Sequence, residues 1–220
     1  MSRTFAMVLD PYYTGEKIFT KKEFIFNPGV TVLVGCNGTG KTTLLHHIKE
    51  ALRKECVPCM DYNNLSNGGS SATSAAMFHN DIELAAALMT SSEGEQIYIN
   101  LGTAAQKIGG FVRNNKGAKE LWLLFDAIDS GLSVDNILEV KEYLFQTIID
   151  DNPNSDVYII VSANEYEMCR GENCFDVRTG KYVAFKTYEA YRKFIIKSRE
   201  KKDARIAAAE KKRGRKNGKN

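Results

Sequence analysis

The stretch GCNGTGKT, residues 35–42, decides the fold of this chain. It fills every fixed position of the phosphate-binding pattern G-x-x-x-x-G-K-[ST], and Lys41 and Thr42 are its last two residues. In this pattern the glycines let backbone N–H groups curl around phosphates, the lysine reaches the β and γ oxygens, and the hydroxyl ligates Mg²⁺. The stretch therefore predicts a site for a nucleoside triphosphate, with ATP and Mg²⁺ as the expected ligands. The residues expected to bind the nucleotide here are Gly35, Asn37, Gly38, Thr39, Gly40, Lys41, Thr42 and Thr43.

The segments on either side of this loop predict a strand and a helix. Residues 29–34 form a short apolar run rich in β-branched side chains, which is typical of a strand. The leucines and the isoleucine within residues 44–52 recur at helical spacing. A loop between a strand and a helix N-terminus is the context in which this pattern binds phosphate.

Further apolar runs predict an α/β fold with a mostly parallel central sheet. LWLLF, residues 121–125, is short and bounded by polar turns, which indicates a buried parallel strand, and VYIIVSAN, residues 157–164, contains another. The runs before residue 35 predict an antiparallel N-terminal β layer with a turn at Asn27-Pro28-Gly29. A further strand is expected in residues 57–62 and a hairpin around Arg178–Gly180. Helices are expected over residues 75–90, 94–113 and 133–150, and from Tyr188 onward.

Length and composition suit one ATPase-sized domain with an appendage. The chain has 220 residues, of which 43% are hydrophobic, enough for one sizeable core. We expect a domain over residues 1–191, with a helical part at about 70–115, and a basic helical tail over 192–220. No apolar run approaches the roughly 18 residues of a membrane span, and the N-terminus lacks a secretory core, so we expect a cytoplasmic protein without a membrane partner. Five cysteines are an odd number, which favours free thiols over a disulfide framework. The loose spacing of Cys169 and Cys174 disfavours a four-thiolate zinc site with Cys56 and Cys59.

Two further motifs accompany the loop. Asp126 ends the run LWLLF, where a carboxylate at the edge of a buried strand can hold Mg²⁺ opposite Thr42. SSEGEQI, residues 91–97, places Ser92 and Glu95 at the spacing of a helix capping box, and Gly94 keeps the helix start bare. Many helices begin in this way without binding a ligand.

Together these motifs resemble those of the ABC-type ATPases, including the RecF and chromosome-maintenance proteins. Asp126 and the run Ser130-Gly131-Leu132 match the family's strand and following loop in register, and SSEGEQI resembles its signature sequence. The resemblance implies an ATP-dependent homodimer in which the signature residues of one copy bind the γ-phosphate held by the other. Those residues are Ser92, Gly94 and Glu95 here. No heptad run occurs between the helix after the loop and the SSEGEQI segment, so a compact head without a coiled coil is expected, similar to small ATPases of bacteriophages and mobile elements.

Departures from the family's pattern predict slow hydrolysis. Ala127 stands where the family has the glutamate that polarises the attacking water, and Asp129 is the nearest carboxylate that could orient water instead. The family's switch histidine falls on Ala163 or Asn164, which makes Asn164 the candidate γ-phosphate sensor. No glutamine lies between Lys41 and Glu95, and only Asn63 or Asn64 could substitute for it. The candidate catalytic residues are therefore Lys41, Asp129 and Asn164.

Charge is distributed unevenly along the chain. From Arg192 to Asn220 there are thirteen Lys and Arg against three acidic residues, although the net charge of the whole chain is only +3. The segment from Arg192 to Lys219 could be a solvated extension or could bind nucleic acid phosphates without reading bases. It could also contact an acidic patch on a protein partner or on the second subunit.

We expect an ATP-binding switch or weak ATPase acting with nucleic acid or a protein partner. A non-hydrolysing, ATP-bound scaffold is the nearest alternative, because the usual glutamate is absent. A nucleoside kinase is disfavoured because no Arg-rich lid is evident, and a transporter ATPase subunit because no Q-loop is recognisable.

Overall fold

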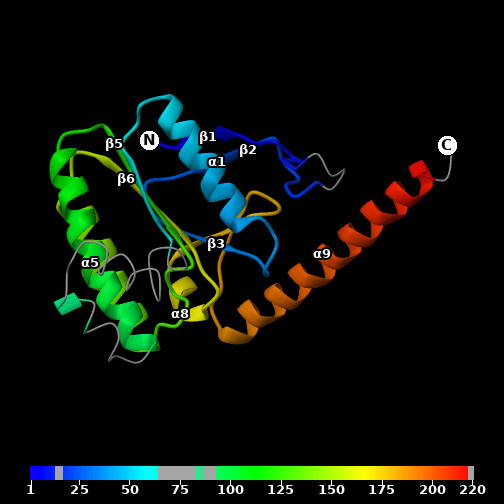
Figure 1. Ribbon diagram of the computed structural model, residues 1–220. Coiled ribbons are helices and arrows are strands. Elements are labelled where there is room, and N and C mark those ends of the chain that lie inside the picture. The colour runs from blue at the N-terminus through cyan, green and yellow to red at the C-terminus, as the bar shows by residue number, and fades with distance from the viewer. Residues whose placement is uncertain (13–16, 64–82, 85, 87–92, 218–220) are drawn as a thin grey trace.

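A six-stranded sheet forms the centre of the molecule in the computed structural model, which describes residues 1–12, 17–63, 83, 84, 86 and 93–217 (Figure 1). The strand order is β4-β5-β6-β3-β7-β8. The first five strands of this order pair in parallel, and β8 pairs antiparallel at one edge, so the mostly parallel sheet is confirmed. The strands are β3 (Gly29–Val34), β4 (Cys59–Asn63), β5 (Glu120–Asp126), β6 (Asp156–Ser162), β7 (Asn173–Asp176) and β8 (Lys181–Val183).

The register of these strands decides which residues meet at the carboxyl edge of the sheet. Asn63 lies opposite Asp126, and Asp126 opposite Ser162. Ser162 in turn lies opposite Leu33, one residue before β3 ends at Val34. Because parallel strands end at the same edge, polar residues from three strands lie beside the loop that follows β3.

One face of the sheet is covered by the first helix and a small second sheet. Helix α1 (Lys41–Lys54) buries its leucines and Ile48 against the strands. β1 (Arg3–Ala6) and β2 (Glu23–Phe26) pair antiparallel and pack over the same face through aromatic contacts such as Phe26 on Phe175, with ring centroids 4.8 Å apart. The antiparallel layer is present, but the turn at residues 27–29 leads from it into the central sheet. It therefore joins two layers and does not close a hairpin.

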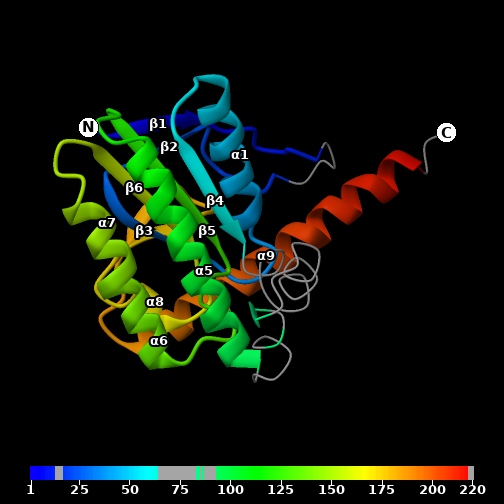
Figure 2. The same cartoon turned by 60° about the vertical axis from the view of Figure 1, so that its left-hand side comes forward.

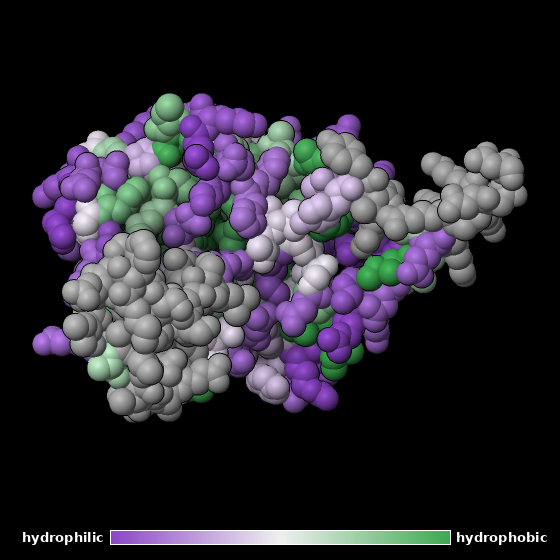
Figure 3. Space-filling model, in the orientation of Figure 1, coloured by the Kyte–Doolittle hydropathy of each residue, from purple (hydrophilic) through white to green (hydrophobic). Residues whose placement is uncertain are grey.

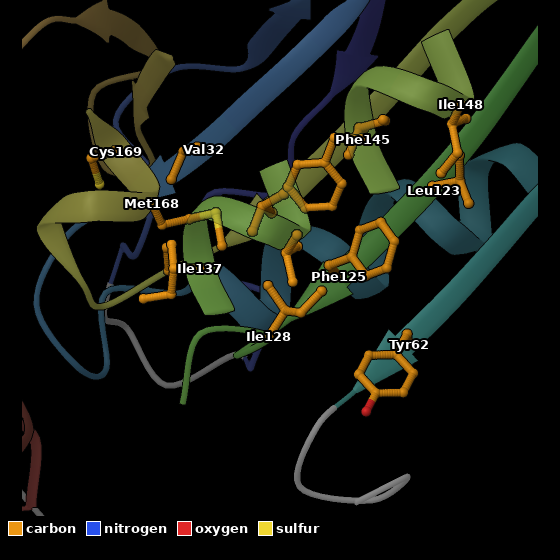
Figure 4. Close-up of a cluster of buried hydrophobic side chains, with 14 of the residues drawn as sticks. Val32, Tyr62, Leu123, Phe125, Ile128, Ile137, Phe145, Ile148, Met168 and Cys169 are labelled. Carbon is orange, nitrogen blue, oxygen red and sulfur yellow. The ribbon is translucent and has the colours of Figure 1, made fainter. Parts of the chain in front are cut away.

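The opposite face is covered by helices (Figure 2). They are α5 (Glu93–Asn114), α6 (Val134–Glu139), the π-helical η1 (Val140–Gln146), α7 (Thr147–Asp150) and α8 (Tyr166–Cys169). The helix expected over 133–150 is present as the consecutive segments α6, η1 and α7, and its middle is π-helical. Their apolar side chains enclose a core around Phe125 and Phe145, whose ring centroids lie 5.3 Å apart (Figure 4). The helix expected over 75–90 falls almost entirely outside the described residues.

The C-terminal helix α9 (Tyr188–Asn217) starts on the body and then extends away from it (Figure 1). Tyr191 is buried in the core under the helical face, and Phe194 and Ile195 pack partly against that core. Residue 191, our expected domain boundary, lies inside this helix, which runs on without interruption.

The structure also bears on the thiols and on membrane association. All five cysteines are free thiols, and no group of three metal-ligating side chains occurs within the described ranges.

Among those same residues, no helix has both the length and the apolar character needed to cross a membrane.

Candidate functional site

The phosphate-binding loop is held closed by contacts within itself and by glycine backbone conformations. Thr39 directs both its N–H and its hydroxyl to the carbonyl oxygen of Cys36, at 3.2 and 2.8 Å. Gly40 precedes α1 with a φ of +100°, and a Cβ there would lie 2.6 Å from Ile18 Cγ2. A residue with a side chain would be strained at this position and would clash as well. These contacts and backbone conformations hold the loop in its curled form.

Lys41 lies across this loop. Its Nζ donates to the carbonyl of Gly35 at 2.8 Å and to Oδ1 of Asn164 at 3.2 Å. The side chain is only 8% exposed, and this burial lowers the pKa of the ammonium, while the nearby carboxylates of Asp129 and Asp126 act in the opposite direction. Both hydrogen-bonding partners of the ammonium are neutral, so phosphate oxygens can replace them as acceptors without breaking an ion pair.

A cavity of about 520 Å³ opens over the loop and the start of α1. Its size lies within the range of small-molecule sites. At one side Tyr12 directs its hydroxyl to that of Thr43, at 2.9 Å. The lining residues are Tyr12, Ile18, Asn37, Gly38, Gly40, Lys41, Thr42, Thr43, Asp126, Ala127, Ser130, Ser162 and Asn164.

Asp126 lies on the wall of this cavity and is held by side chains from both neighbouring strands. Its Oδ1 accepts a hydrogen bond from Ser162 Oγ at 2.5 Å, and its Oδ2 accepts one from Asn63 Nδ2 at 3.0 Å. Thr42, exposed at the start of α1, lines the same cavity. A carboxylate and a hydroxyl are hard oxygen ligands of the kind that Mg²⁺ prefers, so the side chains present fit this ion.

Ala127 adopts a backbone conformation that is rare for a residue with a side chain. Its φ is +53°, and its N–H donates to Ser162 Oγ at 3.1 Å. Ser162 thus fixes both Asp126 and the turn that follows it. Ser162 was not among the residues predicted from the sequence. Its position at the end of a predicted buried strand, like that of Asp126, could have indicated that it lies at the same edge of the sheet.

Asp129 takes a different place from the water-orienting one expected from the sequence. Its side chain is 1% exposed, and Oδ2 accepts the backbone N–H groups of Asn164 and Glu165, each at 2.7 Å. Burial raises the pKa of this carboxyl, although the two N–H groups counteract the rise. Asp129 does not line the cavity over the loop and instead borders a second cavity of about 470 Å³ beside it. In this arrangement the carboxylate positions the segment that carries Asn164.

Asn164 connects Lys41 to the C-terminal helix. Its side-chain oxygen accepts from Lys41, and its backbone oxygen accepts from the hydroxyl of Tyr191 at 2.6 Å. The structure therefore brings together two of the three candidate catalytic residues, Lys41 and Asn164, at the cavity.

The three signature residues are only partly described. α5 begins at Glu93, so Gly94 and Glu95 lie in its first turn. None of the described residues that line the cavity comes from α5. Ser92 lies outside the described part of the chain.

These features define the class of the protein. A parallel sheet whose strand β3 leads through GxxxxGK[ST] into a helix, with a carboxylate on a nearby strand, is a P-loop nucleotide-binding fold. A family model described as an AAA domain matches residues 15–219, nearly the whole chain. The chain therefore belongs to the AAA domain family, a family of P-loop ATPases, which supports ATP as its nucleotide. A comparison with curated proteins gave no match.

Proposed function

We propose that this protein is an ATP-dependent dimerisation switch that hydrolyses ATP slowly. The observation that carries the proposal is the position of Lys41, poised between Gly35 and Asn164 at the cavity that Asp126 also lines. An ammonium, an amide and a carboxylate there are suited to sensing a bound triphosphate. The sensing groups come from three separate segments, so binding at the cavity can change how those segments pack.

Several of the lining residues have distinct parts in the proposed nucleotide binding. In this proposal the N–H groups of the loop and Lys41 hold the phosphates, and Asn164 reaches the γ-phosphate once Lys41 moves to it. Thr42 and Asp126 would hold Mg²⁺, which neutralises negative charge on the phosphates when bound. The ring of Tyr12, exposed at the rim, offers a surface for the base.

Slow hydrolysis follows from the groups that flank the γ-phosphate position. Ala127 has no acid-base group, and Asp129 is buried and already bonded to two backbone N–H groups. Among the described residues at the cavity, Asn164 is the group that we propose to orient the attacking water. The same observation favours a second candidate, a scaffold that binds ATP without hydrolysing it. Steady-state phosphate release by the wild type, compared with Asp129→Ala and Lys41→Ala, separates the two functions.

Dimerisation is the proposed output, with Ser92, Gly94 and Glu95 of a second copy closing on the γ-phosphate. Gel filtration with light scattering tests it on the full chain with and without Mg·ATP. We expect ATP to raise the dimer fraction in the wild type and in Lys54→Ala, an exposed lysine at the end of α1 that serves as the matched control. Lys41→Ala should abolish the increase. An unchanged mass of the wild type with Mg·ATP would refute dimerisation as the output.

The basic C-terminal segment is proposed to contact nucleic acid, in keeping with a role in DNA-related or mobile-element biology. The described surface of α9 is largely hydrophilic where it leaves the body (Figure 3). Binding through clustered Lys and Arg should weaken steeply as salt rises and should depend little on base sequence. Fluorescence anisotropy with two unrelated DNA sequences at several salt concentrations measures both properties.

A further inference from the structure

One face of α9 is seated on the phosphate-binding loop. Ser198 Oγ accepts the N–H of Cys36 at 3.2 Å, Lys202 Nζ donates to the carbonyl of Asn37 at 3.1 Å, and Arg205 Nη1 donates to the carbonyl of Ile18 at 3.2 Å. The three helical residues are spaced i, i+4 and i+7, which places them on one side of the helix. The contacts therefore fix the rotation of α9 about its axis and bring Lys202 to the loop.

Lys202 holds its ammonium beside two residues that line the nucleotide cavity. Its Nζ lies 3.7 Å from the position that a Cβ on Gly38 would occupy, and Gly38 and Asn37 both line that cavity. The side chain is 21% exposed, so it packs on the loop while keeping access to solvent. Lys41 approaches the same loop from inside the fold, at Gly35.

Among the described residues, the charge of Lys202 is poorly compensated in this position. Its partner at the loop is a neutral carbonyl, and its ion pair with Asp203 is 3.9 Å long and involves a carboxylate side chain that is 63% exposed. An ammonium has three donors, so Lys202 can bond a phosphate oxygen without giving up the carbonyl of Asn37. The second cavity is bordered by Asn37 and by Arg199, which lies three residues before Lys202 on α9.

We propose that Lys202 is a nucleotide-binding residue that contacts the terminal phosphate from the same chain. Through it, α9 distinguishes a triphosphate from a diphosphate. This inference rests on the proposed ATP binding and adds to it a cation supplied by a helix that the loop motif does not include. The flexible four-carbon stem of lysine would let the ammonium turn from the carbonyl of Asn37 toward a phosphate bound at the loop.

Binding of fluorescent ATP and ADP analogues with Mg²⁺ to the full chain tests the proposal. Lys202→Ala should weaken ATP on the order of tenfold, the loss of one charge-assisted hydrogen bond, and should leave ADP within about twofold of the wild type. Lys202→Arg should restore most of the preference for ATP because it keeps the charge. Lys201→Ala, an exposed neighbour on the same helix, is the matched control and should bind both nucleotides as the wild type does.

The outcomes separate this inference from the proposed function. Equal weakening of ATP and ADP by Lys202→Ala would overturn it, since the lysine would then only support the loop. It would also be overturned if Lys202→Ala and Lys201→Ala behaved alike. If the wild type bound neither analogue, both the proposed function and this inference would fail. Thermal melts followed by circular dichroism verify that each variant is folded. If the alanine variant is not, Lys202→Gln, which keeps a donor but loses the charge, carries the test, and an unchanged preference for ATP in it would overturn the inference.

Discussion

Replacing Asp129 tests whether its carboxylate holds the segment that carries Asn164. The side chain is almost fully buried and accepts two backbone N–H groups, each at 2.7 Å. Its other oxygen is buried without a hydrogen-bonding partner within the described part of the chain. Asp129→Ala removes the acceptor for both N–H groups, whereas Asp129→Asn keeps one oxygen in the same place. Comparing the two variants therefore separates the effect of losing the hydrogen-bond acceptor from the effect of losing the negative charge.

The structure sets the expected magnitudes. Each hydrogen bond to a charged acceptor contributes about 1.5–3 kcal/mol, so the two bonds together bound the loss at about 6 kcal/mol. Water can reach the N–H groups of the exposed Asn164 and Glu165 after the substitution, and the desolvation of the carboxylate is relieved. We therefore expect Asp129→Ala to lower the free energy of unfolding by about 3 kcal/mol and Asp129→Asn by about 1 kcal/mol.

The pH dependence of stability follows from the raised pKa of Asp129. Folding favours its protonated form, so its contribution to stability is fully present below the ordinary carboxyl pKa of about 3.9 and is lost as pH rises through the folded value. Asp129→Asn does not titrate. Its free energy of unfolding should therefore improve relative to that of the wild type as pH rises through this window.

Urea unfolding followed by the fluorescence of the buried Trp122 measures these differences. Asp151→Ala, which removes an exposed carboxylate, is the control and should change stability by less than about 0.5 kcal/mol. The reasoning would be refuted if Asp129→Ala cost less than about 1 kcal/mol, or if Asp129→Asn were as destabilised as the alanine variant.

Two further substitutions test the loop and the strand edge. Gly40→Ala should weaken the binding of an ATP analogue at least about tenfold in a titration, because the φ of +100° at this position is strained for alanine and the new Cβ would clash with Ile18. An affinity equal to that of the wild type would contradict this prediction. Ser162→Ala removes hydrogen bonds to Asp126 and to the N–H of Ala127, so the Mg²⁺ concentration needed for half-maximal ATP binding should rise by about three- to tenfold. An unchanged Mg²⁺ dependence would show that Ser162 does not hold Asp126 in a binding position.

The sequence alone predicted the elements whose causes are local. The loop from Gly35 to Thr42 follows from glycine freedom and from the spacing of Lys41, and the buried strands follow from short apolar runs. Asp126 was predicted because a carboxylate that ends such a strand must lie at the carboxyl edge of the sheet. These inferences require only a few neighbouring residues, and the parallel sheet confirms the architecture that they imply.

Only the tertiary structure showed which distant residues contact the loop and Asp126. Ser162 reaches Asp126 through strand register, and Lys202 reaches Asn37 because α9 turns one face to the loop. The sequence suggested Asp129 as a water-orienting group because it is the nearest carboxylate to Ala127. Its burial and its hydrogen-bonding partners cannot be read from a local motif and were seen only in the structure. The local sequence thus sufficed to predict the loop over residues 35–42 and its role in binding phosphate. The groups that hold or supplement them depend on contacts across more than thirty residues of sequence, which form only when the sheet and helices pack.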